Sequence, residues 1–156
     1  MVSLSEPLSL YAIPAMWVIS YYPIFKRAAF IRKTNAVNPI APRATAANLA
    51  KNKDLSPEFV AKAARMEGAH QNGLENLPFF GLAVIAGNVA GLHNRTLNIA
   101  AGSYLVARML FNYFYFVQET KRTARLRSLA WITSLTFPFY LLVKSAQVFG
   151  ARSMQS

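Results

Sequence analysis

Long apolar stretches alternate with short polar connections along this chain. Four stretches stand out, at about residues 8–25, 77–92, 97–117 and 129–149. A helix needs about 20 mostly apolar residues to cross the hydrocarbon core of a bilayer, and each stretch reaches or approaches that length. The pattern predicts an all-α integral membrane protein, a bundle of four membrane-spanning helices in a single domain over residues 1–156.

The second apolar stretch is short for a span, but a polar helical segment precedes it from about residue 58. Ser56 has the side chain of a helix N-cap, Pro57 suits the first helical position and Glu58 suits the first turn. A helix over residues 58–92 would be about 50 Å long at 1.5 Å per residue. About a third of this helix must then project beyond the hydrocarbon, at its polar end.

The composition also indicates a membrane protein. Of the 156 residues, 54% are hydrophobic and only 15% are charged, whereas soluble domains have about 25% charged residues. The chain contains no Cys, which excludes disulfides, thiolate metal sites and a cysteine nucleophile. No His or carboxylate pair has the spacing of metal ligands, so we expect no metal site.

The net charge of +11 comes from 17 Lys and Arg against 6 Asp and Glu. Such an excess in a soluble protein would suggest nucleic acid as a partner. Here most of the basic residues lie in the first and third connections, at Lys26, Arg27, Arg32, Lys33, Arg43, Lys51 and Lys53 and at Lys121, Arg122, Arg125 and Arg127. The positive-inside rule therefore places both connections in the cytoplasm and both termini on the opposite side. We expect the lipid bilayer, and no nucleic acid, as a partner.

A polar cluster lies where the polar segment enters the second apolar stretch. Its members are Arg65, Glu67, His70, Gln71, Asn72 and Glu75. Ionisable groups near a membrane helix are costly unless they face each other or a polar cavity, so they mark a candidate functional site. At 100° per residue, Arg65, Asn72 and Glu75 fall on one stripe of the helix.

A second polar stripe, Arg108, Asn112 and Tyr115, lies on the third apolar stretch, and Arg127 and Ser128 directly precede the fourth. Facing stripes would surround a pocket with carboxylate, amide, phenol and guanidinium groups. This set suits a small, charged, peptide-like ligand, because the carboxylate can bind an ammonium group and the guanidinium groups can bind carboxylates.

Two structural alternatives stay open for these residues. Arg108 and Glu75 could form an ion pair that only holds the bundle together. His70 alone could be a hydrogen-bonded helix residue without a role in binding.

The segment Ala69-His-Gln-Asn-Gly-Leu-Glu-Asn-Leu-Pro-Phe-Phe80 and the series Arg108…Tyr115…Arg127-Ser128 resemble a known family. It comprises the membrane-associated proteins in eicosanoid and glutathione metabolism (MAPEG), including the microsomal glutathione transferases. A helical Asn-x-x-Glu followed closely by Pro carries the resemblance, which extends over nearly the whole chain. It implies a homotrimer of four-helix bundles that binds glutathione between subunits at the cytoplasmic side.

The resemblance also implies roles for single residues. The glutathione-binding positions correspond to Arg27, His70, Asn72, Glu75, Arg108 and Tyr115. Arg127 and Ser128 match the position of the catalytic groups that hold and activate the thiol. A guanidinium suits that role because a nearby positive charge favours thiolate, the nucleophilic form, over thiol.

The chain departs from the family pattern at Gly68, where glutathione-binding members usually carry Arg. We expect Arg65, one turn earlier, to reach over the space that Gly68 leaves and to contribute to the pocket.

Three functions are compatible with these features. The first is a glutathione-dependent transferase, peroxidase or isomerase acting on lipophilic substrates that arrive through the bilayer. The second is a glutathione-independent enzyme for a hydrophobic metabolite, with Glu75, His70 or Tyr115 as acid–base groups. The third is a non-catalytic lipid-binding or scaffolding protein. We expect an enzyme of the first kind. As a multi-pass membrane protein, it is expected in the endoplasmic reticulum or another intracellular membrane if the source is eukaryotic.

Overall fold

The computed structural model describes residues 5–154, which form helices and no strand. The four long helices are α1 (Ala12–Ile31), α3 (Pro57–Val89), α4 (Asn94–Val117) and α5 (Lys121–Ser153). Shorter elements are η1 (Ser9–Tyr11) before α1, and η2 (Pro42–Ala44) and α2 (Thr45–Lys51) in the connection from α1 to α3. The predicted all-α fold is confirmed.

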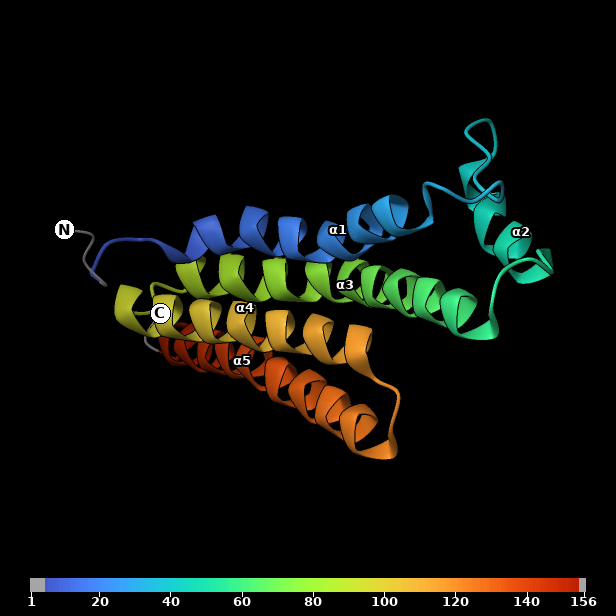
Figure 1. Ribbon diagram of the computed structural model, residues 1–156. Helices are drawn as coiled ribbons and strands as arrows, with labels where there is room; N and C mark the ends of the chain where they lie inside the picture. The colour runs from blue at the N-terminus through green and yellow to red at the C-terminus, as the bar shows by residue number, and fades with distance from the viewer. Residues whose placement is uncertain (1–4, 155–156) are drawn as a thin grey trace.

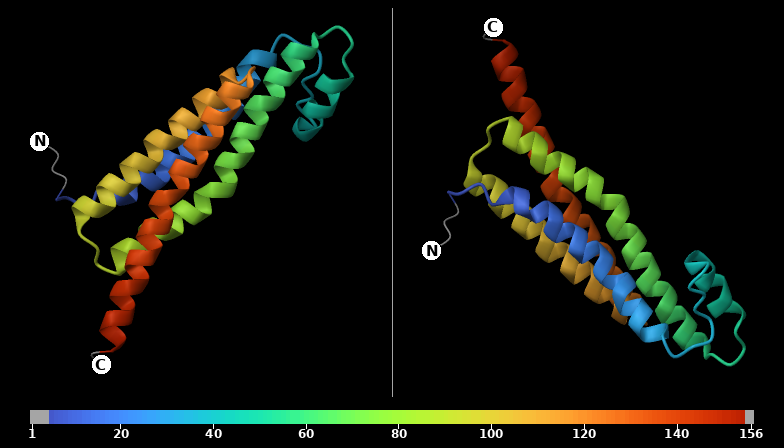
Figure 2. Two further views of the ribbon diagram at one scale, coloured as in Figure 1. Left: turned by 90° about the horizontal axis from the view of Figure 1, so that it is seen from below. Right: turned by 90° about the horizontal axis from the view of Figure 1, so that it is seen from above.

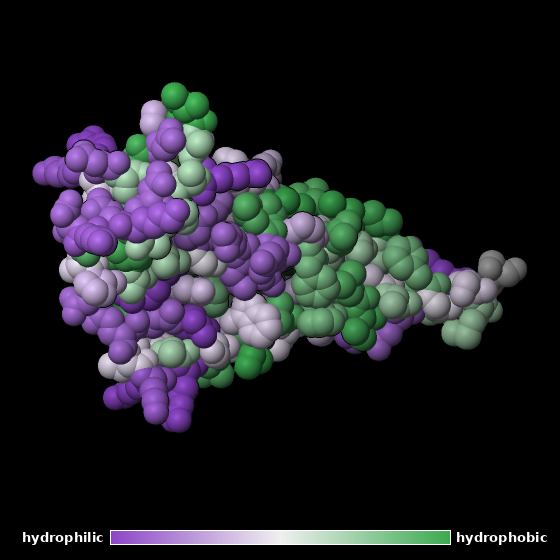
Figure 3. Space-filling model, turned by 90° about the vertical axis from the view of Figure 1, so that its right-hand side faces the viewer, coloured by the Kyte–Doolittle hydropathy of each residue, from purple (hydrophilic) through white to green (hydrophobic). Residues whose placement is uncertain are grey.

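The four long helices lie side by side and run in alternating directions (Figure 1). The α1–α3 connection with α2 and the α4–α5 connection lie at one end of the molecule, here called the loop end. The α3–α4 turn lies at the opposite end, where the described chain also starts and finishes. The two basic connections thus share one end, as predicted, and hydrophilic side chains gather there beside a hydrophobic band (Figure 3). Helix α5 extends past its neighbours at its C-terminal end (Figure 2).

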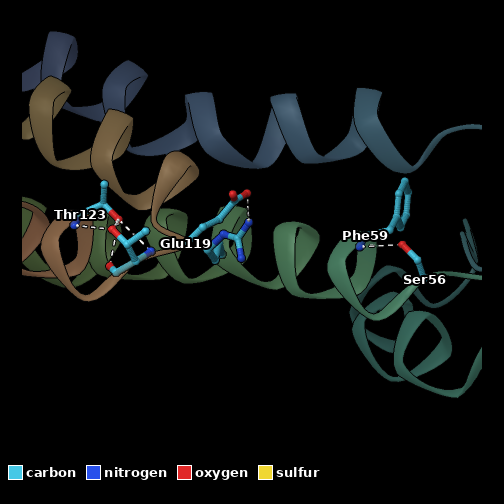
Figure 4. A network of polar contacts seen from close by, with 6 residues as sticks. Ser56, Phe59, Glu119 and Thr123 are labelled. Atoms are coloured by element: carbon cyan, nitrogen blue, oxygen red, sulfur yellow. Dashed lines mark hydrogen bonds and ion pairs between the residues drawn. The ribbon is translucent and has the colours of Figure 1, made fainter.

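Local sequence signals fix the ends of α3 and the start of α5. The Ser56 hydroxyl accepts a hydrogen bond from the Phe59 N–H at 3.2 Å, which confirms the predicted helix start (Figure 4). Helix α3 stops before the predicted end at residue 92 because Gly91 has a φ of +72° and the Leu92 N–H donates back to the helix. This is the glycine-terminated helix end that needs a left-handed residue. Thr120 caps α5 by a reciprocal pair of bonds with Thr123 (Figure 4).

The interior is built from aromatic stacking and close helix contacts. Phe80 of α3 and Tyr104 of α4 stack with ring centroids 4.0 Å apart and an interplanar angle of 6°. Helices α1 and α3 approach so closely that a Cβ on Gly73 would lie 2.9 Å from the Cα of Ser20. Small residues permit this contact, as is typical where helices pack within a membrane.

The outer surface is largely apolar, with exposed fractions of 63% for Leu82, 52% for Val106 and 56% for Phe139. Among the described helices, α5 is the one that is long and apolar enough to qualify as a membrane span, and only 22% of its most apolar window is buried inside the molecule. A core helix of a soluble protein would be mostly buried. Helix α3 carries the polar cluster along its loop-end half, which lowers its hydropathy. Four membrane spans therefore remain a prediction.

Candidate functional site

Arg108 lies in the interior of the bundle, between α3 and α4. Its side chain is 1% exposed, and one terminal nitrogen donates a hydrogen bond to Asn72 Oδ1 at 2.8 Å. The guanidinium carbon lies 4.4 Å from the centroid of the Phe111 ring. The Nε and Nη1 atoms of Arg108 are buried and have no hydrogen-bond partner within the described part of the chain. A buried guanidinium with unused donors is costly unless something else, such as a ligand or water, satisfies them.

A line of aromatic and basic contacts leads from Arg108 to the loop end. Phe111 meets Tyr115 edge-on with centroids 5.3 Å apart, and the guanidinium of Arg127 lies 5.1 Å from the Tyr115 ring. Arg127 also donates to Gln118 Oε1 at 2.8 Å and contacts Ser128 Oγ at 3.4 Å. The structure thus brings together residues that the sequence placed on separate helices. Phe111 and Gln118 are site residues that the sequence pattern does not predict, although Phe111 follows Arg108 at helical spacing.

A hollow of about 920 Å³ opens at the loop end between α3 and the start of α5. We call it the α3–α5 hollow. Its charged and hydroxyl-bearing side chains are Glu58, Arg65, Tyr115, Glu119, Thr120, Lys121 and Arg127. Its volume falls in the range of small-molecule sites, about 300–1,000 Å³. Asn72 and Arg108 do not line this hollow; Arg108 is buried in the bundle interior and Asn72, its hydrogen-bond partner, is half-buried.

Arg65 forms an ion pair across this hollow. Its Nη2 lies 3.7 Å from Glu119 Oε1, and the Glu119 side chain is 75% exposed (Figure 4). Such a long, solvated ion pair contributes little to the stability of the fold, so a ligand carboxylate could replace Glu119 as the partner of Arg65. The Nε of Arg65 is buried without a partner among the described residues.

Gly68 leaves no empty space in this structure. A Cβ added there would lie 2.6 Å from the Tyr115 hydroxyl oxygen, so the phenol already fills the position. The expectation that Arg65 reaches over this space is therefore wrong. Arg65 extends to Glu119 in the α4–α5 connection instead, because Tyr115 occupies the nearer position.

Arg27 of α1 and His70 of α3 lie where these two helices meet, away from the α3–α5 hollow. Arg27 Nη1 is 2.9 Å from Glu67 Oε2, and the side chain of Arg27 is 8% exposed. Both Arg27 and His70 line a second hollow of about 670 Å³, the α1–α3 hollow, together with Arg32 and Arg43. Within one chain, Arg27 and His70 are thus separated from the residues of the α3–α5 hollow.

Pro23 explains where Asn112 points. Proline lacks an N–H, so inside α1 it leaves the carbonyl of Ile19 without its helical partner. Asn112 Nδ2 donates to the Ile19 carbonyl at 3.0 Å, and His70 Nδ1 donates to the Ser20 carbonyl at 2.8 Å. His70 is thus hydrogen-bonded to α1, and its role in ligand binding stays a prediction. The predicted grouping of Asn112 with the pocket residues of its stripe is wrong, because Asn112 faces α1.

Glu75 is exposed and has no hydrogen-bond or ion-pair partner among residues 5–154. The structural alternative of an Arg108–Glu75 pair is wrong within one chain, since Arg108 bonds to Asn72. A step of three residues turns a helix position by about 60°, which is enough to move Glu75 out of the α3–α4 contact.

Comparison with protein-family models matches residues 9–147 to the MAPEG family. The chain belongs to the MAPEG family. A search of curated proteins and a search of solved structures each gave no match. MAPEG proteins are membrane proteins, generally trimeric, whose functions lie in glutathione-related transfer and eicosanoid metabolism, and they generally use glutathione. Together with the apolar helix α5, this membership identifies the chain as a membrane protein.

Proposed function

We propose that this MAPEG protein is a glutathione-dependent enzyme of the transferase, peroxidase or isomerase kind that acts on lipophilic substrates. The observation that carries the proposal is the placement of Arg127, whose guanidinium lies against the Tyr115 ring in the wall of the α3–α5 hollow. Membership of a family that generally uses glutathione supports the same ligand.

The residues around the hollow suit an anionic peptide such as glutathione. Arg65 offers a buried Nε that has no partner in the described chain, and its ion pair with Glu119 is long and solvated. Arg127 is bound to Gln118, a neutral side chain, so an anion can replace that bond without breaking an ion pair. Tyr115 adds a phenol hydroxyl within the same wall.

Bound glutathione would supply a thiolate as nucleophile for an electrophilic atom of the substrate. The role of Arg127 is to hold positive charge beside the sulfur, which favours thiolate over thiol. Ser128 lies next to the same guanidinium and can donate its hydroxyl hydrogen to an anion there. Asn72 and Arg108 hold α3 and α4 together.

A homotrimer is part of the proposal, because one chain divides the predicted residues between two hollows. The α1–α3 hollow contains Arg27 and His70, and the α3–α5 hollow contains Tyr115 and Arg127. In copies packed around a three-fold axis, the α1–α3 hollow of one chain can lie beside the α3–α5 hollow of its neighbour. The same packing would cover Glu75, whose exposed carboxylate is costly beside lipid.

Arg127→Ala tests the proposal in detergent-purified protein. Calorimetry should show that wild type binds glutathione, and ultraviolet absorbance should show its thiolate. The variant should retain binding but lose the thiolate absorbance and about 30- to 1000-fold in conjugation rate, the effect of about 2–4 kcal/mol from one lost electrostatic contact. Arg125→Ala is the matched control, because Arg125 is exposed on the same turn and does not line the hollow. Equal losses in both variants would contradict the role of Arg127.

The contact between Gly68 and Tyr115 favours a second candidate, a glutathione-independent enzyme. The phenol occupies the position where glutathione-binding relatives carry a guanidinium, and a tyrosine hydroxyl can serve in acid–base chemistry. Calorimetry distinguishes the two. No glutathione binding at millimolar concentration in wild type and in Gly68→Arg/Tyr115→Phe would exclude the transferase and leave the second candidate.

A further inference from the structure

A groove of about 430 Å³ runs along the outside of the bundle between α1 and α4, away from both hollows. Its walls are Val18, Ile19, Tyr22 and Lys26 from α1 and Met109, Asn112, Tyr113 and Phe116 from α4. Val18 is 60% exposed and Tyr113 is 58% exposed, so the groove is open to the surroundings of the bundle. Among these described wall residues Lys26 alone is charged, and it lies at the loop-end limit of the groove.

Lys26 is held by aromatic rings and has no carboxylate partner. Its Nζ lies 5.0 Å from the ring centroid of Phe116 and 5.7 Å from that of Tyr22. No acidic side chain among residues 5–154 lies within ion-pair distance of Lys26. Cation–π contacts fix the position of the ammonium but leave its charge uncompensated. The groove thus offers a fixed positive charge at one end and an apolar channel below it.

The dimensions of the groove match one lipid chain. From Lys26 to Val18, α1 advances eight residues, or about 12 Å at 1.5 Å per residue. One leaflet of a bilayer has a hydrocarbon depth of about 15 Å. The loop end carries the basic connections, which the positive-inside rule assigns to the cytoplasmic leaflet, where anionic lipids are concentrated.

We propose that the α1–α4 groove binds an anionic phospholipid of the cytoplasmic leaflet, with the headgroup phosphate on Lys26 and one acyl chain against Val18, Tyr22 and Tyr113. The site is separate from the α3–α5 hollow and does not depend on glutathione use. Phosphate and ammonium supply the charge complementarity, and the apolar walls supply the contact with the chain.

Lipid titration of detergent-purified protein, monitored by native mass spectrometry, tests this site. The probes are 1-palmitoyl-2-oleoyl phosphatidylglycerol and the phosphatidylcholine with the same chains. Wild type should bind phosphatidylglycerol about fivefold more tightly, the ratio expected from about 1 kcal/mol for one basic residue near a membrane surface. Lys26→Gln should lose this preference and Lys26→Arg should keep it.

Two controls separate the groove from general surface charge. Lys62 also lies over an aromatic ring, 5.5 Å from the centroid of Phe30, but outside the groove, so Lys62→Gln should keep the preference. Val18→Trp fills the exposed channel and should weaken the binding of both lipids severalfold. Met109→Trp repeats the test from the opposite wall of the groove.

Three outcomes would overturn the proposal. Wild type could bind both lipids equally. Lys62→Gln could lose as much of the preference as Lys26→Gln. Glycerol 3-phosphate at millimolar concentration could displace the lipid, which would make this a site for a free phosphate anion. Lack of competition, together with loss of binding in Val18→Trp, supports a lipid site.

Discussion

The hydroxyl oxygen of Tyr115 lies 2.6 Å from the place where a Cβ atom of residue 68 would be. The phenol of Tyr115 on α4 can therefore occupy this position only because residue 68 on α3 is a glycine and has no side chain. The same phenol ring supports Arg127. A side chain at position 68 must displace Tyr115 and so disturb the guanidinium in the hollow.

Gly68→Ala should destabilise the protein although alanine is the better helix former. The new methyl group overlaps the Tyr115 hydroxyl, and overpacking of this kind costs about 1–3 kcal/mol. In the Tyr115→Phe background the nearest remaining ring atom is Cζ, at 3.2 Å, so the penalty should shrink. Thermal unfolding in detergent of the two single variants and the double variant measures the coupling.

Gly102→Ala is the control for helix propensity, because nothing in the described chain lies within 4 Å of a Cβ at Gly102. It should leave the protein unchanged or stabilise it by up to about 1 kcal/mol. Equal stability of Gly68→Ala and Gly102→Ala would show that Tyr115 does not occupy the space beside Gly68.

Asn72→Ala should destabilise the bundle through Arg108. It removes the acceptor of a hydrogen bond from a guanidinium that is 1% exposed, and a bond to a charged group is worth about 1.5–3 kcal/mol. Asn76→Ala is the matched control, because the Asn76 amide donates to Asn72 and not to another helix. The midpoint of thermal unfolding should fall clearly for Asn72→Ala and little for Asn76→Ala. The reverse order would show that Arg108 is satisfied by another group.

Pro23→Ala should make Asn112 less important. Alanine restores the N–H that the Ile19 carbonyl lacks, so that carbonyl no longer depends on Asn112 Nδ2. Asn112→Ala should cost about 1–3 kcal/mol in the wild-type background, the penalty for a buried unsatisfied group, and less in the Pro23→Ala background. A double-mutant cycle of unfolding free energies checks this. Additive effects would mean that Asn112 stabilises the bundle independently of the proline.

Glu75→Gln should leave the folding of each chain unchanged, within about 0.5 kcal/mol, because its carboxylate is exposed and has no partner among the described residues of the chain. If Glu75 binds the ammonium group of glutathione, calorimetry should show weaker binding by roughly tenfold or more, the effect of about 1.4 kcal/mol. Mass measurement in detergent should still show a trimer. Simultaneous loss of trimer and binding would assign Glu75 to subunit contact alone. A wild type that is monomeric at micromolar concentration would contradict the proposed assembly.

Most of the fold was predictable from the sequence because its signals are local. Long runs of apolar residues predict the long helices, and Ser56-Pro57-Glu58 predicts the start of α3. The two clusters of basic residues predict which connections lie at the same end. Each of these signals lies within the segment whose structure it predicts. The end of α3 was placed too late because the left-handed conformation of Gly91 ends the helix while the apolar sequence continues.

The grouping of side chains around the site was less predictable, because it depends on which helix each face meets. Helical spacing put Asn112 and Tyr115 on one stripe, yet Asn112 faces α1 and Tyr115 faces α3. Two residues decide these contacts. Pro23 leaves the Ile19 carbonyl of α1 without its helical donor, and Gly68 leaves room for the phenol of Tyr115. Both act on a partner distant in sequence, so no local pattern reveals the pairing.

The proline in α1 also bears on the order in which the bundle can assemble. Helix α1 precedes α4 in the chain, and its Ile19 carbonyl, which Pro23 deprives of a helical partner, depends on a donor from α4. An unsatisfied carbonyl in hydrocarbon costs several kcal/mol, so if α1 spans the bilayer as predicted, it is unstable there on its own. Docking of α4 removes this penalty. Helix α1 thus gains its full stability only after α4 has been made and packed against it, which favours cooperative over stepwise folding.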